Sequence, residues 1–370
     1  METKKYRFDE VTINFDKKRI PLSSAQREKR QGTFRYYGAQ GVIDHVDDYI
    51  YDGTYLLIAE DGENLKSKKQ NIAQVVDGQF WVNNHAHIVQ GNERCDTRFL
   101  CYLINSMDLS GYVTGSAQPK LSQANLNAIT LSLPTLVEQK RIVEYLYMLD
   151  QKIDVNQQIN DNLADLLQTV YQERFGDTSL IANQGILSDI CSYSRDKVAV
   201  SELNVSTYFS TENMLSGKAG STEATSLPTT SQTTACHKGD TLISNIRPYF
   251  KKIVYCEDNC GCSTDVLCFT PSQPRYSAYL FSTLYADKFF AFMVAGSKGT
   301  KMPRGDKQQI MTYPVVLPSE EELAGFNTIA SPLLEQIYSN SAENKRLSIL
   351  RDTLLPKLMS GEIDVSAIQL

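Results

Sequence analysis

The sequence predicts two similar domains of mixed helix and strand that alternate with two long helices. Three observations predict this fold class. The chain has 370 residues, more than a single hydrophobic core usually organises. Residues 134–175 match residues 318–359 without a gap, and both segments show the apolar periodicity of a coiled coil. The predicted boundaries are 1–135 and 179–318 for the two domains, and 136–178 and 319–370 for the helical segments.

Composition and the first residues predict a soluble cytoplasmic protein. Hydrophobic residues make up 42% and charged residues 22% of the chain, and no apolar run approaches the roughly eighteen residues that span a membrane. Residues 1–16 are charged and lack the apolar centre of a signal peptide. The eight cysteines are scattered and lack the paired C-x-x-C spacing of a zinc site, so we expect thiols in the core.

The net charge of −6 argues against a nucleic-acid partner until its distribution is considered. Residues 1–135 carry 16 basic and 16 acidic residues, and residues 181–318 carry 13 and 11. Residues 136–180 and 319–370 carry 4 basic and 8 acidic residues each. The acidic excess therefore lies in the two helical segments, and the two domains are locally balanced.

The internal repeat indicates a tandem duplication with a constant offset of 184 residues. Upstream of the helices the copies diverge but keep their order, which is a strand-like run, an apolar run and then a Gly-Ser loop at 115–126 or 296–310. The matched pairs in the helical segments are Pro134 and Pro318, Glu138 and Glu322, Leu149 and Leu333, Ile153 and Ile337, Asn156 and Asn340, Asn160 and Asn344, Leu163 and Leu347, and Val170 and Leu354.

The helical segments show apolar residues at alternating steps of four and three, which is typical of a coiled-coil seam. Asparagines occupy two slots of this seam in each copy, where they cost stability but fix register and partner. A drift of one residue in the pattern would instead turn them toward solvent. The residues predicted to pair the helices or to dock a partner are Ile142, Leu146, Leu149, Ile153, Asn156, Asn160, Leu333, Ile337, Asn340, Asn344 and Leu347.

The length of the helices predicts a spacer between two sites. Forty helical residues span about 60 Å, far more than one domain needs. Pro332 follows Ser331, a possible N-cap, so we expect the second segment to break into a short helix and a long one from Leu333 to Met359. The long part would span about 40 Å, roughly one turn of DNA.

Aromatic, amide and basic residues in both domains suit contacts with DNA bases and phosphates. In the first domain they surround the strand-like run and the Gly-Ser loop, and in the second they follow the corresponding run and lie in the second Gly-Ser loop, although surface lysines alone are common on any soluble protein. The residues predicted to contact DNA are Tyr36, Tyr37, Gln40, Lys66, Lys68, Lys69, Lys120, Asn245, Arg247, Tyr249, Lys251, Lys298, Lys301 and Arg304.

A catalytic role has little support in the sequence. The four histidines form no zincin spacing, and the chain has no Walker A loop, no GxGxxG and no G-x-S-x-G motif. His85 and His87 alternate along a predicted strand near Trp81, so we expect them to point the same way as a surface or half-buried pair. No catalytic residue and no metal ligand is predicted.

Four stretches resemble the specificity subunit of type I restriction-modification enzymes, and the resemblance covers essentially the whole chain. They are YYGAQGVIDHVDDYIYDGTYLLIAEDG at 36–62, LPTLVEQKRIVEYLYMLDQKID at 133–154, GDTLISNIRPYFKKIVY at 239–255 and LRDTLLPKLMSGEIDV at 350–365. The resemblance implies two α/β target recognition domains, each reading one half of a bipartite asymmetric DNA target, and two helices that form an antiparallel pair and set the gap.

The resemblance also implies partners and a non-catalytic role for this chain. Each helical segment would dock a modification subunit that methylates adenine with S-adenosylmethionine, and restriction subunits would join to cut DNA with ATP and Mg²⁺. No cofactor is expected on this chain itself. The second helix begins PSEEELAGFNTI where the first begins PTLVEQKRI, so docking at the second site could be less regular. Other interpretations are a coiled-coil interaction scaffold and a silent allele without DNA-reading activity.

Overall fold

The computed structural model describes residues 2–67, 70–115, 118–176 and 183–363. The chain divides into two compact units, which we call unit 1 (residues 1–153 and 345–370) and unit 2 (residues 154–344). Both long helices contribute to both units, because α6 (Leu136–Phe175) and α11 (Glu320–Ser360) each contain a division point. The boundaries predicted for the domains and the helical segments stay predictions.

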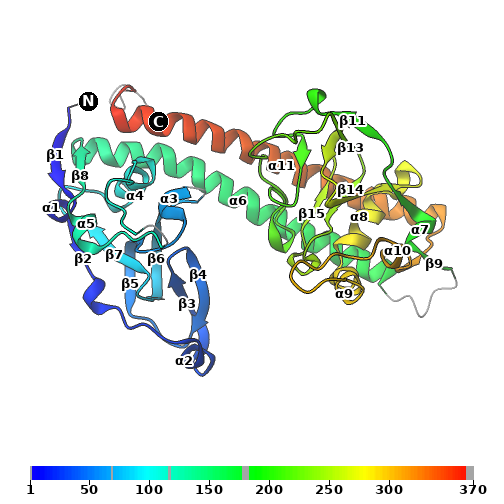
Figure 1. The fold of residues 1–370 in the computed structure, drawn as a ribbon, viewed down its shortest axis with the longest axis horizontal. Coiled ribbons are helices and arrows are strands. Elements are labelled where there is room, and N and C mark those ends of the chain that lie inside the picture. The colour runs from blue at the N-terminus through cyan, green and yellow to red at the C-terminus, as the bar shows by residue number, and fades with distance from the viewer. Residues whose placement is uncertain (1, 68–69, 116–117, 177–182, 364–370) are drawn as a thin grey trace. The chain divides into compact units, whose positions relative to one another are not determined.

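Unit 1 is built on a sheet that, in the described residues, has six strands in the order β2-β7-β5-β6-β3-β4 (Figure 1). All neighbours run antiparallel except β3 and β6. A short pair, β1 and β8, lies outside this sheet. The strands are β1 (Lys4–Arg7), β2 (Thr12–Asn14), β3 (Gln31–Gly38), β4 (Gly41–Val46), β5 (Tyr51–Ala59), β6 (Ala73–Val82), β7 (Ala86–Gly91) and β8 (Thr130–Leu133).

Both faces of this sheet are buried, because alternate residues of a strand point to opposite faces. Leu56 and Ile58 of β5 pack on one side with α4 (Thr97–Ser106) and with residues of α6 and α11. Tyr55 and Leu57 pack on the other side in an aromatic cluster around Phe80. The shorter helices of unit 1 are α1 (Phe8–Val11), η1 (Asp16–Lys18), α2 (Ser24–Glu28), α3 (Asn64–Ser67) and α5 (Gln123–Asn127).

Unit 2 contains two four-stranded sheets in its described residues, with the orders β10-β17-β14-β15 and β11-β13-β16-β12. A short pair, β9 and β18, accompanies them. The strands are β9 (Gln184–Ile186), β10 (Cys191–Tyr193), β11 (Lys197–Ala199), β12 (Tyr208–Phe209), β13 (Gln232–Cys236), β14 (Thr241–Ser244), β15 (Ile253–Tyr255), β16 (Cys260–Cys262), β17 (Val266–Pro271) and β18 (Pro314–Val316).

Two clusters form the core of unit 2. The larger one joins Tyr171 and Phe175 of α6 to Tyr279 and Phe326, whose rings meet edge to face or tilted. The smaller one contains five cysteines, all as free thiols. The helices are α7 (Leu187–Ile190), η2 (Val200–Glu202), η3 (Ser216–Lys218), η4 (Pro248–Phe250), η5 (Pro274–Tyr276), α8 (Ser277–Tyr285), α9 (Asp287–Ala295) and α10 (Lys307–Ile310).

The two units repeat the same local structures, which confirms the predicted internal repeat. The backbone N–H of Phe8 donates to the Ile129 carbonyl at 2.9 Å, and that of Leu187 donates to the Tyr313 carbonyl at 2.8 Å. Each long helix also begins with the same capping box, in which Glu138 or Glu322 accepts from the backbone N–H three residues earlier. The predicted fold class, two mixed α and β domains alternating with two long helices, is confirmed.

The two long helices run antiparallel, since contacts that advance along α6 retreat along α11. Within unit 2, Asn156 donates to Asn344 at 2.9 Å, and Asn340 donates to Asn160 at 2.9 Å. Asn156 also donates to Glu343 at 2.7 Å. Three of the four seam asparagines are buried, and all four bond across the pair, so the pattern does not drift toward solvent.

The expectation that Pro332 breaks the second helical segment was wrong. α11 is continuous from Glu320 to Ser360. A proline inside a helix costs about 3 kcal/mol because it removes one backbone hydrogen bond. Phe326, Ala330 and Leu334 are buried in one cluster on both sides of the proline, whereas Pro332 is exposed. Burial of the flanking residues outweighs the cost, so the chain keeps its helical path.

The Asn160 and Asn340 pair predicts an unequal response to single and double replacement. N160L leaves the buried Asn340 amide without its partner and should lower the free energy of unfolding by about 1–3 kcal/mol. N160L/N340L removes both polar groups and should restore or exceed the stability of the parent chain. Urea unfolding of the three proteins measures this difference. A double variant that is less stable than N160L would show that the two asparagines are not coupled.

Candidate nucleic-acid interface

Four loops of unit 1 converge at one end of its sheet. The loop after β5 is hydrogen-bonded to two others: Glu60 N–H donates to the His85 carbonyl at 2.9 Å, and Leu121 N–H donates to the Glu60 carbonyl at 2.8 Å. Asn83 N–H donates to the Tyr37 carbonyl at 3.0 Å, which adds the β3–β4 turn. We call this group of loops, at 38–41, 60–63, 83–85, 114–115 and 118–121, loop cluster 1.

Unit 2 builds the same connections from different residues. Asn245 N–H donates to the Asp265 carbonyl at 2.8 Å, and Gly305 N–H donates to the Asn245 carbonyl at 3.2 Å. Lys298 and Arg304 exchange two backbone hydrogen bonds at 2.9 Å, as Thr114 and Lys120 do in unit 1 at 2.8 and 2.9 Å. We call the loops at 245–247, 263–265 and 296–306 loop cluster 2. Each unit thus presents a Gly-Ser loop against the end of a central strand.

A basic residue closes the Gly-Ser loop at the same position of both clusters. Lys120 lies 3.3 Å from a Glu60 carboxylate oxygen, and Arg304 lies 3.0 Å from an Asp265 carboxylate oxygen. Both cationic side chains are a little more than half exposed, at 55% and 56%. Surface ion pairs of this kind hold a side chain loosely, so an incoming anionic phosphate can compete for it.

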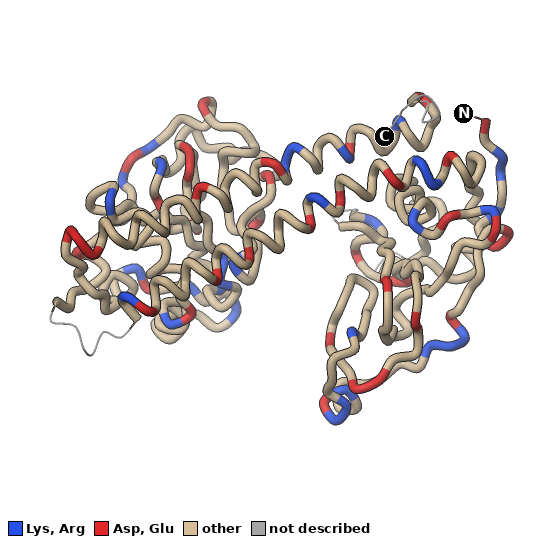
Figure 2. The backbone as a smooth tube through the Cα atoms, turned by 180° about the vertical axis from the view of Figure 1, so that it is seen from behind, with Lys and Arg blue, Asp and Glu red and all other residues tan. Residues whose placement is uncertain are grey.

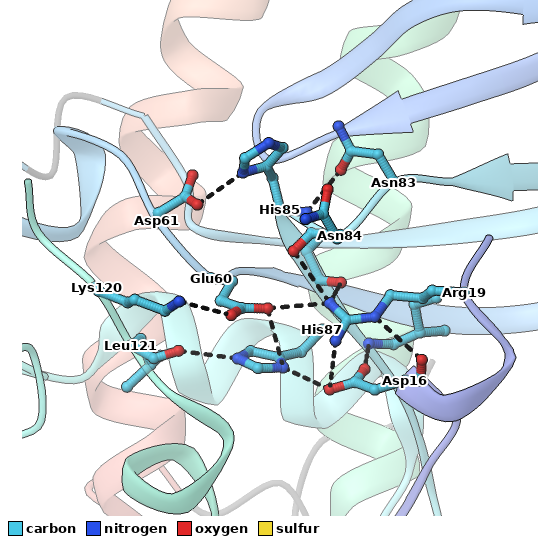
Figure 3. A network of polar contacts seen from close by, with 12 residues as sticks. Asp16, Arg19, Glu60, Asp61, Asn83, Asn84, His85, His87, Lys120 and Leu121 are labelled. Carbon is cyan, nitrogen blue, oxygen red and sulfur yellow. Dashed lines mark hydrogen bonds and ion pairs between the residues drawn. The ribbon is translucent and has the colours of Figure 1, made fainter. Parts of the chain in front are cut away.

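A buried network of charges supports loop cluster 1 from below (Figure 3). His87 is buried, and its Nδ1 lies 2.6 Å from the Asp16 carboxylate. Arg19 lies 3.0 Å from Glu60, the same carboxylate that meets Lys120 on its other side. Acidic and basic groups therefore alternate from the core outward to the loop.

Hydrogen-bond chemistry fixes the protonation of His87. Its Nε2 lies 2.9 Å from the Leu121 carbonyl oxygen, which can only accept, so Nε2 carries a proton. An ionised Asp16 also only accepts, so Nδ1 carries the second proton. Burial alone would lower the pKa of His87, but the hydrogen bonds to Asp16 and Leu121 raise it overall. Burial raises and the bonds from His87 and Ile88 lower the pKa of Asp16, with a net lowering.

The histidines depart from the sequence-based expectation of a surface or half-buried pair. His85 is half exposed and lies 2.7 Å from Asp61, whereas His87 is almost fully buried. The reason is that β7 begins at Ala86, so His85 belongs to the preceding turn and does not share the alternation of the strand. The buried role of His87 was missed because its partner Asp16 is 71 residues away in the sequence.

The predicted DNA-contact residues of unit 1 separate into core and surface groups. Tyr36 and Tyr37 lie in the core instead of on the surface, because β3 is an inner strand and both of its faces are covered. Gln40, Lys66 and Lys120 are exposed in or beside loop cluster 1, and Lys66 donates to the Gly115 carbonyl at 3.0 Å. Lys68 and Lys69 lie outside the described residues.

The predicted residues of unit 2 lie closer together. Lys298, Lys301 and Arg304 are exposed on the Gly-Ser loop, and Tyr249 is exposed within η4. Asn245 is buried, and Arg247 is partly buried. Lys251 is also partly buried and lies 2.9 Å from Asp287. Sequence reasoning did not select Asp265, which holds Arg304. Contact with DNA stays a prediction for every residue of these two groups.

The helical residues predicted for pairing or docking lie at the α6–α11 seam or beside it. Ile142 and Leu146 are buried in the core of unit 1, and Leu149, Ile153, Leu333, Ile337 and Leu347 are partly buried. The divergent start of the second helix has a structural reason. Gln139 is buried and accepts from the backbone N–H of Asp96, whereas the equivalent residue of unit 2 is the buried Leu323. The hydrogen bond of Gln139 in unit 1 is thus replaced by apolar packing of Leu323 in unit 2.

Basic and acidic residues are interspersed along the chain in both units. Blue and red segments alternate along the tube in Figure 2, in the domains and along the helices. In the described residues no group of three or more His, Cys, Asp or Glu side chains could hold a metal ion. None of the helices described here is long and apolar enough to cross a membrane.

The charged state of His87 predicts a pH-dependent effect of its replacement. Because the pKa of His87 is raised in the folded state, its contribution is complete below about pH 6.5 and is lost as pH rises through the folded pKa. H87Q removes the charged ring 2.6 Å from Asp16 and leaves Arg19, at 3.6 Å, as its counter-charge, so it should cost about 2 kcal/mol of unfolding free energy at pH 6.

Urea unfolding at pH 6 and pH 9 tests this prediction, and the difference between parent and H87Q should shrink at pH 9. H85Q is the matched control and should change stability by less than about 0.5 kcal/mol, because His85 is half exposed. A loss of stability in H87Q that is identical at both pH values would mean that the ring is neutral.

Comparison with known proteins agrees with this geometry. Residues 2–164 match the family model described as type I restriction modification DNA specificity domain. A putative type I restriction enzyme specificity subunit of Haemophilus influenzae is 36% identical over 138 residues, which are 37% of this chain and 35% of that protein. The EcoprrI specificity subunit of Escherichia coli is 26% identical over 125 residues, 33% of this chain and 30% of that protein.

These alignments span about a third of the length of the curated relatives. Similarity of fold extends over nearly the whole chain. The crystal structure of a type I restriction-modification S subunit from M. genitalium has a TM-score of 0.60 at 16% identity, with coverage of 97% of this chain and 96% of that one. Residues 2–164 are therefore similar to the type I restriction modification DNA specificity domain, and the chain as a whole shares the fold of a type I restriction-modification S subunit.

Proposed function

We propose that this chain recognises DNA sequence through two loop clusters, each reading one half of a bipartite asymmetric target. The observation that supports this most is the duplicated Gly-Ser loop. In both units it ends in an exposed cation at the same backbone position, against the end of a central strand. A chain with two such clusters, built from different side chains, suits two different half-sites.

The side chains around each cluster supply both kinds of DNA contact. Lysines and arginines suit phosphates, and the exposed amide of Gln40 can pair with base edges. Asn83 and His85 extend the polar surface of loop cluster 1. The chain itself would carry out no reaction. Its contribution would be to select the sequence on which partner subunits act.

The long helices would set the gap between the half-sites and dock two modification subunits. α6 has 40 residues and would span about 60 Å, which suits a spacer. Apolar side chains remain exposed along the helices, including Val137, Met148 and Val155 on α6 and Ile349 on α11. Docked modification subunits would bring S-adenosylmethionine, and restriction subunits would use ATP and Mg²⁺. This chain would need no cofactor.

Mapping of methylated adenines in genomic DNA tests the proposed function. Cells that express the chain with the modification subunit encoded beside it are compared with cells that lack the chain. We expect a new asymmetric motif split by a gap of fixed length. If the complex assembles but no new methylation arises, the proposal fails, and a coiled-coil scaffold or a silent allele explains the chain instead.

Replacement of the loop cations should weaken DNA binding without a change in sequence preference if they contact phosphates. K120Q and R304Q should each lower affinity for all duplexes and reduce the slope of log K against log salt by about 1. Titration of the assembled complex with target and non-target duplexes from 50 to about 300 mM salt measures both effects.

K5Q, at an exposed lysine of β1, controls for the loss of one positive charge on the same unit. An unchanged salt slope in K120Q and R304Q would remove these two side chains from the phosphate contacts. If K5Q lowers the slope of log K against log salt by the same amount, the loss of affinity comes from net charge alone.

A further inference from the structure

Unit 2 holds three cationic residues in a backbone conformation that side chains disfavour. Among the described residues, the non-glycine residues with positive φ are Lys218 at 66°, Arg247 at 50° and Lys251 at 50°. This left-handed region brings Cβ close to the following carbonyl, so it is usually occupied by glycine. Such strain persists where the side chain has a role that outweighs it.

The three residues lie together. Arg247 and Lys251 flank η4, and the Lys218 N–H donates to the Lys251 carbonyl at 2.9 Å. Both lysines bond Asp287, at 2.8 and 2.9 Å. Their positive charges therefore have a counter-charge on the protein, and a structural role accounts for them.

Arg247 occupies the position that glycine holds in unit 1. Its N–H donates to the Pro303 carbonyl at 2.8 Å, and the Gly62 N–H donates to the Pro119 carbonyl at 3.2 Å. Each residue in turn accepts from the N–H three residues later, that of Phe250 or Leu65. Gly62 has a φ of 124°, a value that only glycine adopts readily. The same backbone hydrogen bonds are thus made with and without a side chain.

Within the described residues, no partner holds the Arg247 side chain. In the described part of the chain its guanidinium makes neither a hydrogen bond nor an ion pair, and its Nε is buried without an acceptor. The amide oxygen of Asn245, two residues earlier in the chain, is likewise buried without a donor. The nearby Arg304, by contrast, is held by Asp265. A buried donor without an acceptor is costly, unless a bound molecule supplies the acceptor.

We propose that Arg247 determines the sequence specificity of unit 2 by hydrogen bonding to a base edge in its half of the DNA target. This inference rests on the proposed function. Guanine offers two acceptors, O6 and N7, that fit the fork of an arginine, and Arg247 stands on the loop that carries the exposed aromatic Tyr249. At the equivalent position of unit 1, Gly62 carries no side chain and can make no such contact.

The decisive variant is R247G, which installs the residue of unit 1. It should fold with an unchanged or higher melting temperature, because glycine relieves the strain at φ 50°. Methylation mapping with the assembled complex should still give a split motif, but one half should lose discrimination at one or two positions by about 10-fold or more. The other half and the gap should stay as in the parent.

K218G is the matched control, because it relieves the same strain at a residue whose ammonium already bonds Asp287. It should leave the motif unchanged. A purely structural role of Arg247 would lower the melting temperature and leave the motif intact, so either of these results in R247G overturns the proposal. An equal loss of methylation at all sites, without relaxed sequence, would indicate a phosphate contact and also overturns it.

Failure of the proposed function is a separate result, because it appears in the parent chain. If the parent directs no split motif, the proposed function fails and the assignment of Arg247 fails with it. If the parent directs a split motif and R247G directs the same one with the same discrimination, only the assignment of Arg247 fails.

Discussion

The pairing of the two long helices is the constraint on which each unit depends, because the helices are part of the cores. In unit 1, Ile142 and Leu146 of α6 pack with Leu358 of α11 under the sheet. In unit 2, Tyr171 of α6 packs with Phe326 of α11. Removal of either helix would expose apolar surface in the domain that it supports. A helix pair that is also a core element cannot change its register without cost to the fold.

Buried polar groups set that register where apolar side chains alone would permit sliding. The asparagine contacts in unit 2 join amides that must find partners once they leave water. Buried polar groups also fix the position of a loop, since the buried His87 ring holds the Leu121 carbonyl at 2.9 Å. In both cases one polar group specifies position and the surrounding apolar packing supplies the stability.

The sequence predicted the repeat, the helices and the seam, because these depend on periodicity within a short window. It did not predict the core position of Tyr36, since an aromatic strand in a sheet with two covered faces looks like an exposed binding strand from composition alone. The helix break predicted at Pro332 failed for a related reason. The low helix propensity of proline is outweighed by the packing of Phe326 and Leu334. The pairing of Asp16 with His87 needed the fold, because the two residues are far apart in sequence.

The asparagine contacts carry a consequence for the history of the chain. With the repeat offset applied, Asn156 corresponds to Asn340 and Asn160 to Asn344, so exchange of the two copies converts the Asn156–Asn344 contact into the Asn160–Asn340 contact. Two contacts that exchange in this way are isologous, the kind found in two-fold homodimers. Two identical subunits can read only a palindrome. Joined in one polypeptide, each half is free to mutate alone, as Gly62 and Arg247 already show.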